Sequence, residues 1–106
     1  MWSFRLKDII LQKGNVTILN NVIDAGKGEK TVVRIDNPKE GKVNVIVMTL
    51  DGNIVDYLNR GNLSEGTSYF TWNGRNKNNR PVARGIYFVR IIGNGFDETR
   101  KVMVVK

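Results

Sequence analysis

The 106-residue sequence contains neither cysteine nor histidine. Without cysteine the chain has no disulfide and no thiolate nucleophile. Without histidine it lacks the usual base of Ser-His-Asp and Cys-His sites and the commonest zinc ligand. No apolar run approaches the roughly 18 residues of a membrane-spanning helix, so no span is expected. The hydrophobic residues make up 41% of the chain, which is enough for one modest core.

The carboxylates do not form a pattern typical of catalysis. Asp97 and Glu98 are adjacent, so on a strand they point to opposite faces, and most other acids lie at strand ends or turns. A paired-carboxylate site needs two acids brought together in one cleft. The stretch "DAGKGEK" (24–30) lacks the spacing of a phosphate-binding loop. The sequence therefore predicts no enzyme and no cofactor.

The positive charge is unevenly placed. The net charge is +7, and residues 73–106 carry eight basic residues against two acidic ones. A basic half indicates either an anionic partner or a solvated face that keeps a small domain in solution. Charge alone favours the second interpretation, because it identifies no particular partner.

β-Branched and aromatic residues gather in short runs separated by Gly, Asn and Asp, which is the pattern of strands. The runs are 16–19, 30–36, 43–50, 53–59, 68–72, 86–92 and 99–105. Asp51-Gly52 predicts a two-residue hairpin turn, because both residues tolerate positive φ. Seven strands with no helical alternation predict an all-β fold, an Ig-like or fibronectin-III-like antiparallel sandwich.

Alternation predicts which side of each strand faces the core. Val43, Val45 and Val47 share one face of their strand, opposite Asn44, and Tyr87, Val89 and Ile91 are expected to point inward. Arg90 then lies on an exposed sheet face. The final run, 99–105, is expected to pair beside 86–92. Residues 4–12 fit a strand or a linker arm, so residues 1–15 are interpreted as an arm to a missing upstream part and 16–106 as the domain.

Three segments carry a recognisable pattern: "VNVIVMTLDGNIVDYL" (43–58), "GTSYFTWNGRNKNNRPVARGIYFVRI" (66–91) and "ETRKVMVVK" (98–106). Together they resemble the bacterial Ig-like domain of the flagellar hook-capping protein, and the closing pattern also resembles type IX secretion sorting domains. The positions that match the family are Trp72, Gly74, Val82, Gly85 and Tyr87.

The sequence departs from the family's pattern at three asparagines. Asn73, Asn76 and Asn79 stand where the family usually has Asp, Asp and Gly. Asparagine tolerates the left-handed conformation, so Asn79 is predicted to take a positive φ in place of glycine. The two amides keep the local turn bonding of a carboxylate but remove the charge that a calcium ion needs. No metal site is therefore expected in this loop.

The resemblance implies a non-catalytic structural, assembly or docking module. It also implies the C-terminal domain of a larger bacterial protein that is extracytoplasmic, on the cell surface or secreted. Its partners would be other proteins or upstream domains of the same chain. Trp72 and Tyr87 are expected in the core, and the indole N–H of Trp72 needs a partner. A side chain at Gly85 is expected to obstruct the backbone near the inward Tyr87.

The alternative is a ligand-binding module that uses the basic loop within 75–90 for an anionic glycan, lipopolysaccharide or nucleic acid. Its candidate residues are Arg75, Lys77, Arg80 and Arg84. Nucleic acid is disfavoured, because the strand aromatics lack basic neighbours on the same face. Trp2, Phe4 and Phe96 are the weaker candidates for carbohydrate binding. We expect the basic residues of 75–90 to point in different directions, since the loop's Asn and Gly turns re-aim successive side chains.

Overall fold

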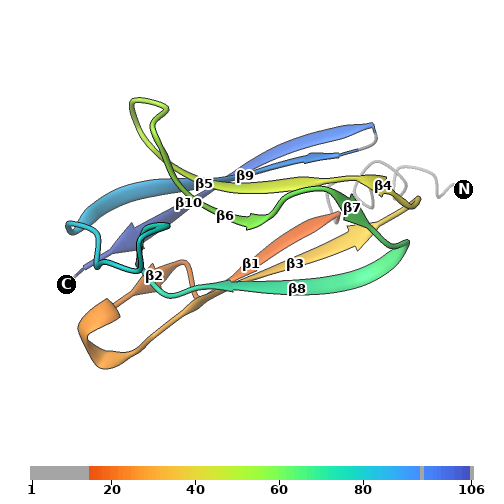
Figure 1. Cartoon of the computed structure of the whole chain (residues 1–106). Helices are drawn as coiled ribbons and strands as arrows, with labels where there is room; N and C mark the ends of the chain where they lie inside the picture. Colours follow the sequence, from red (N-terminus) through yellow and green to blue (C-terminus); the bar gives the residue numbers. More distant parts are fainter. Residues whose placement is uncertain (1–14, 94, 106) are drawn as a thin grey trace, which may run out of the picture.

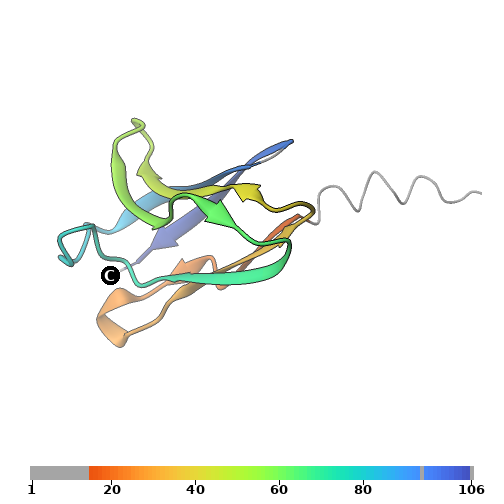
Figure 2. The same cartoon turned by 45° about the vertical axis from the view of Figure 1, so that its right-hand side comes forward.

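The computed structural model describes residues 15–93 and 95–105, which form ten strands and one 3-10 helix. Figures 1 and 2 show two stacked sheets with a small β-ribbon at one end. The elements are β1 (Val16–Leu19), β2 (Val22–Ile23), η1 (Ala25–Lys27), β3 (Thr31–Asn37), β4 (Gly41–Lys42), β5 (Asn44–Thr49), β6 (Ile54–Asn59), β7 (Asn62–Leu63), β8 (Gly66–Trp72), β9 (Gly85–Gly93) and β10 (Phe96–Val104).

One layer is a three-stranded sheet in the order β1-β3-β8, and the other is a five-stranded sheet in the order β2-β10-β9-β5-β6. The short strands β4 and β7 pair with each other at the end opposite the β8–β9 connection (Figure 1). All pairs are antiparallel except β2 with β10. The sequence-based prediction of an all-β sandwich is therefore confirmed.

The core lies between the inner faces of the two sheets, as the alternation predicted. The three-stranded sheet contributes Val33 and Ile35, which have no exposed surface. The five-stranded sheet contributes Val45, Val47, Tyr87, Val89 and Ile91, and Val43 is buried beside them just before β5. Burying a residue of this size stabilises the fold by about 1.5–3 kcal/mol.

All seven predicted runs are strands, with ends shifted by a few residues. The closing run begins earlier than expected, at Phe96, and pairs with β9 along its whole length. The prediction that residues 99–105 lie beside 86–92 is therefore confirmed. The segment 4–12 and the arm 1–15 fall outside the described residues, apart from Asn15. No helix in the described part of the chain is long and apolar enough to cross a membrane.

Three two-residue strands, β2, β4 and β7, were not predicted from the sequence. The chain leaves β1 through Asn20, which has a positive φ of 65°. It then crosses to the other sheet, where the Met103 N–H donates to the Asn21 carbonyl and the Val105 N–H to the Ile23 carbonyl. Two residues are too short to show alternation, so such strands appear only once their partner is placed.

The hairpin between β5 and β6 differs from the predicted two-residue turn. The Thr49 N–H donates to the Asn53 carbonyl, which leaves a loop of Leu50, Asp51 and Gly52. Only Gly52 of these has a positive φ, 90°. The prediction of a positive φ at Asp51 was wrong, because a turn at ordinary φ followed by left-handed glycine closes a three-residue hairpin equally well.

A buried asparagine ties the β-ribbon to the sandwich. The Asn37 side-chain amide donates to the carbonyls of Leu63 (3.0 Å) and Ser64 (3.1 Å). Asn37 ends β3 and is buried, and its own Oδ1 has no hydrogen-bond partner within the described residues. Its two donated bonds hold β7 against the sandwich.

Candidate functional site: the crossing loop and the outer groove

The segment that links β8 to β9 carries the chain from one sheet to the other, and residues 73–84 form it (Figure 1). The loop folds back on itself as a small hairpin. The Val82 N–H donates to the Gly74 carbonyl, and the Asn76 N–H to the Arg80 carbonyl. An isolated bridge joins Arg75 and Pro81. Backbone bonds therefore give this polar stretch a defined shape without an apolar core of its own.

Asparagine side chains complete the turn at the tip of the crossing loop. The Asn76 Oδ1 accepts from the N–H groups of Asn78 (2.9 Å) and Arg80 (3.0 Å). Asn79 has a φ of 62°, so the predicted left-handed conformation is confirmed. The Lys77 N–H donates to the Val55 carbonyl and fixes the tip to β6. The amide at position 76 thus does the turn bonding that the family's aspartate would do.

Trp72 and Tyr87 stand at the two ends of the loop and pack against each other. Their ring centroids are 5.4 Å apart and their planes are inclined by 61°, an edge-to-face pair. The Trp72 indole N–H donates to the Arg75 carbonyl (2.8 Å), and the Tyr87 hydroxyl donates to the Ala83 carbonyl (2.6 Å). Burial raises the pKa of the Tyr87 hydroxyl. Both rings therefore anchor the loop to the core.

The two family glycines serve different purposes. A Cβ on Gly74 would lie 2.9 Å from the Ala25 Cβ, so the loop and η1 can approach only because position 74 has no side chain. A Cβ on Gly85 would meet no atom within 4 Å. The expected obstruction at Gly85 was wrong. Its φ of 148° is the reason for glycine there, since side chains disfavour that conformation. Val82 is half-buried against the core.

The candidate basic residues differ in how the fold uses them. Arg75 is half-buried as a residue, and its guanidinium donates to the Asn79 carbonyl (2.9 Å), so it stabilises its own loop. Lys77, Arg80 and Arg84 are exposed. Arg90 lies apart from them on the sheet, where two hydrogen bonds of 3.0 and 2.7 Å join it to Asp97.

The Arg90–Asp97 pair perturbs both groups. Hydrogen bonding to Asp97 raises the pKa of Arg90, and hydrogen bonding to Arg90 lowers the pKa of Asp97. Glu98 points to the opposite face and pairs with Arg100 at 2.9 Å. The adjacent acids therefore serve two separate ion pairs. Within the described residues, no group of three or more Asp or Glu side chains is placed to hold a metal ion.

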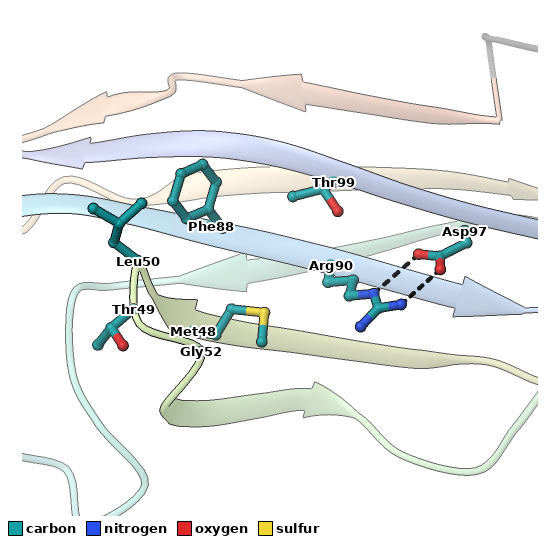
Figure 3. A pocket seen from close by; sticks show the side chains of 8 residues that line it. All are labelled: Met48, Thr49, Leu50, Gly52, Phe88, Arg90, Asp97 and Thr99. Atoms are coloured by element: carbon teal, nitrogen blue, oxygen red, sulfur yellow. Dashed lines mark hydrogen bonds and ion pairs between the residues drawn. The ribbon is translucent and has the colours of Figure 1, made fainter.

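Sequence reasoning missed a groove on the outer face of the five-stranded sheet. The β5–β6 hairpin rises over this face, and between it and β9–β10 lies a hollow of about 500 Å³ (Figure 3). Its lining is Met48, Thr49, Leu50, Gly52, Phe88, Arg90, Asp97 and Thr99. The only signal in the sequence was that the run 86–92 is apolar on both of its faces.

Of the aromatic side chains considered for carbohydrate binding, Phe96 packs against the core and its ring fills the space beside Gly93. It therefore offers no open stacking face. Trp2 and Phe4 lie outside the described residues.

The topology and the tethered crossing loop define an Ig-like β-sandwich domain. A family model for the FlgD Ig-like domain matches residues 20–95, and the chain belongs to that family. The resemblance seen in the sequence is thereby confirmed.

Two solved structures share the fold. PorZ, described as an essential bacterial surface component of the type IX secretion system of Porphyromonas gingivalis, matches with a TM-score of 0.64 and 14% identity over 89% of this chain. FlgD from P. aeruginosa matches with a TM-score of 0.58 and 21% identity over 83% of this chain. The chain spans 12% of the PorZ chain and 67% of the FlgD chain. No protein with a curated description matches in sequence.

Proposed function

We propose that this chain is a non-catalytic docking or assembly module of a larger extracytoplasmic or surface-associated bacterial protein. The observation that carries the proposal is the use of the family-motif residues within the fold. Trp72 and Tyr87 anchor the crossing loop, Gly74 lets it meet η1, and Asn79 turns its tip. Residues engaged in this way hold a scaffold together and do not present reactive groups to a substrate.

One structural neighbour supports both the extracytoplasmic setting and the place of this domain within a longer protein. The structural neighbour PorZ is a bacterial surface component, and the fold occupies only 12% of that chain, as a module within a longer protein would. The absence of cysteine is compatible with any compartment and adds nothing for or against.

Protease accessibility in cells of the source bacterium tests the setting. Antibodies against residues 15–105 would follow the natural protein while the outer envelope and then the inner membrane are opened. We expect protease to reach it before a cytoplasmic marker is digested. Protection until the inner membrane is lysed would contradict the extracytoplasmic proposal.

The second candidate function is anion binding by the crossing loop, favoured by the exposed side chains of Lys77, Arg80 and Arg84. A heparin column distinguishes the two functions. General charge attraction gives weak retention that ends near physiological salt, because exposed charges are screened over about 8 Å. Retention well above physiological salt, lost when Arg75, Lys77, Arg80 and Arg84 are replaced together by Ser, would favour the anion-binding site.

A further inference from the structure

The outer faces of the two sheets differ in character. On the three-stranded sheet the outward residues are largely polar and bonded to one another: Arg34 pairs with Asp36 at 3.3 Å, and the Thr67 hydroxyl donates to Asp36 at 2.7 Å. Two large apolar side chains are exposed there, Leu19 at the end of β1 and Tyr69 in the middle of β8, and Tyr69 lies opposite Arg34. This face therefore resembles an ordinary solvated sheet surface.

The outer face of the five-stranded sheet is apolar across several strands. Residues that lie opposite one another in antiparallel register share a face, and Met48 lies opposite both Ile54 and Phe88. The remaining outward apolar residues are Val22, Ile46, Ile86, Ile92 and Met103. Val22, Ile54 and Ile86 are among the exposed large hydrophobic residues of the described chain. Contiguous exposed apolar surface of this kind marks interaction sites in soluble proteins.

The groove lies at the centre of this apolar face. Leu50 overhangs it from the hairpin with 76% of its surface exposed, and Phe88 faces it from β9 (Figure 3). At the other end Arg90 and Asp97 bind each other through two hydrogen bonds, so their charges are paired. The space between suits a large apolar side chain better than a polar small molecule.

The charges around the groove indicate which kind of partner could occupy it. Lys101 lies opposite Phe88 on this face, and the Arg60 guanidinium sits 3.9 Å from the centre of the Tyr57 ring, beside Ile46. Neither cation has a carboxylate partner among the described residues. The carboxylates on these strands are already engaged: Arg90 holds Asp97, and Asp56 accepts from the Tyr57 N–H.

The chain as a whole is also positively charged, with a net charge of +7. It repels a second copy of the chain and attracts an acidic partner. Residues 1–14 contain three basic residues and one acid, so charge does not favour them as occupants either.

We propose that this outer groove docks an acidic segment of another protein, with large apolar side chains of that segment inserted between Leu50 and Phe88. The inference rests on the proposed docking function and names its surface and the chemistry of its partner. The apolar contacts supply affinity, while Lys101 and Arg60 supply orientation and speed of association.

The test uses a displayed library of random dodecapeptides as the probe and the full chain as bait at low salt. Leu50→Asp removes the overhang at a solvent-exposed turn position, so the variant keeps its fold. Tyr69→Asp is the matched control, since Tyr69 is 61% exposed on the other sheet. We expect selected peptides to be rich in Asp and Glu and to carry large apolar residues. Their affinity should fall at least tenfold on Leu50→Asp and stay unchanged on Tyr69→Asp.

A second variant isolates the charge contribution. Arg60→Glu with Lys101→Glu should weaken the selected acidic peptides and flatten their salt dependence, because the cations that attract them are reversed. The far-UV spectrum and melting temperature of each variant report whether the fold is kept.

Four outcomes would overturn the proposal. They are the absence of enriched peptides, enrichment of neutral or basic peptides, equal loss on Leu50→Asp and Tyr69→Asp, and a dimer in sedimentation equilibrium that Leu50→Asp dissolves. Peptide binding that appears only after residues 1–14 are deleted would also overturn it, because the chain's own arm would then fill the groove. The protease experiment above is independent of all of these, so the docking site can fail while the setting stands.

Discussion

Replacing Trp72 with alanine tests whether the family tryptophan holds the sandwich together. The side chain is 1% exposed, packs edge-to-face on Tyr87, and donates its N–H to the Arg75 carbonyl. Truncating a buried Trp to Ala costs about 3–5 kcal/mol in unfolding free energy. That range already includes the aromatic pair, worth about 0.5–1.5 kcal/mol. The Arg75 carbonyl adds little, because Arg75 is half-buried and water can replace the lost donor.

The expected loss is large relative to the unfolding free energy of the whole domain. A domain of this size has an unfolding free energy of about 5–15 kcal/mol, so Trp72→Ala removes about 60% or more of it at the lower end. Trp72→Phe separates the two contributions, since it keeps a ring against Tyr87 but loses the N–H donor and part of the volume. We expect it to cost about 1–2 kcal/mol, which combines one hydrogen bond and a modest loss of packing.

The assay is urea unfolding followed by far-UV circular dichroism, which does not depend on tryptophan fluorescence. The variants should show lower midpoints with the slope unchanged, in the order wild type, Trp72→Phe, Trp72→Ala. If Trp72→Ala unfolded within about 1 kcal/mol of the wild type, the side chain would not carry core packing and the role given to it would be wrong.

Three further predictions concern the crossing loop and the last strand. Asn79→Gly should leave stability unchanged or slightly raised, whereas Asn79→Val should cost about 1–2 kcal/mol at a positive φ; equal unfolding midpoints for the two would refute the strain argument. A chain ending at Glu98 should aggregate, because it loses the buried Val102 and Val104 and leaves β9 as a bare edge; a soluble, folded product would mean that the tail is a detachable sorting signal. Replacing the four loop cations together by Ser should keep the fold and lower only weak, salt-sensitive association; loss of a tight stoichiometric partner at physiological salt would identify the loop as the binding site. The four are Arg75, Lys77, Arg80 and Arg84.

The fold followed from the sequence wherever one physical signal dominated. Alternation over six or more residues determined the inward faces of β5 and β9, because only one register buries the valines. The left-handed residue at Asn79 followed from the family's glycine at that position and from asparagine's tolerance of that conformation. Each of these features depends on residues close together in the chain, so local patterns were enough.

Features that depend on distant partners did not follow. The sheet switch at Asn20 creates β2 only because β10, some eighty residues later, offers its edge. The close approach of Gly74 to Ala25 and the bonds from Asn37 to β7 also join segments that the sequence keeps apart. The hairpin at Gly52 was misjudged because two turn types share the same Asp-Gly signal.

The groove could not be predicted from the sequence for a different reason. An apolar residue on the outer face of a strand looks the same in sequence whether it is isolated or joined by others. Phe88 became part of a surface only when the register set it beside Met48 and the hairpin placed Leu50 above both. Patches of this kind are properties of the assembled sheet.

The central claim is that the domain docks through its sheet face while the crossing loop maintains the fold. The direct measurement is sedimentation of the natural protein with its envelope complexes, in source-organism cells that produce the wild type, Leu50→Asp or the fourfold loop-to-Ser variant. We expect Leu50→Asp to release the protein from the complexes and the fourfold variant to stay bound. Release of the fourfold variant with retention of Leu50→Asp, or a wild type that sediments alone, would contradict it.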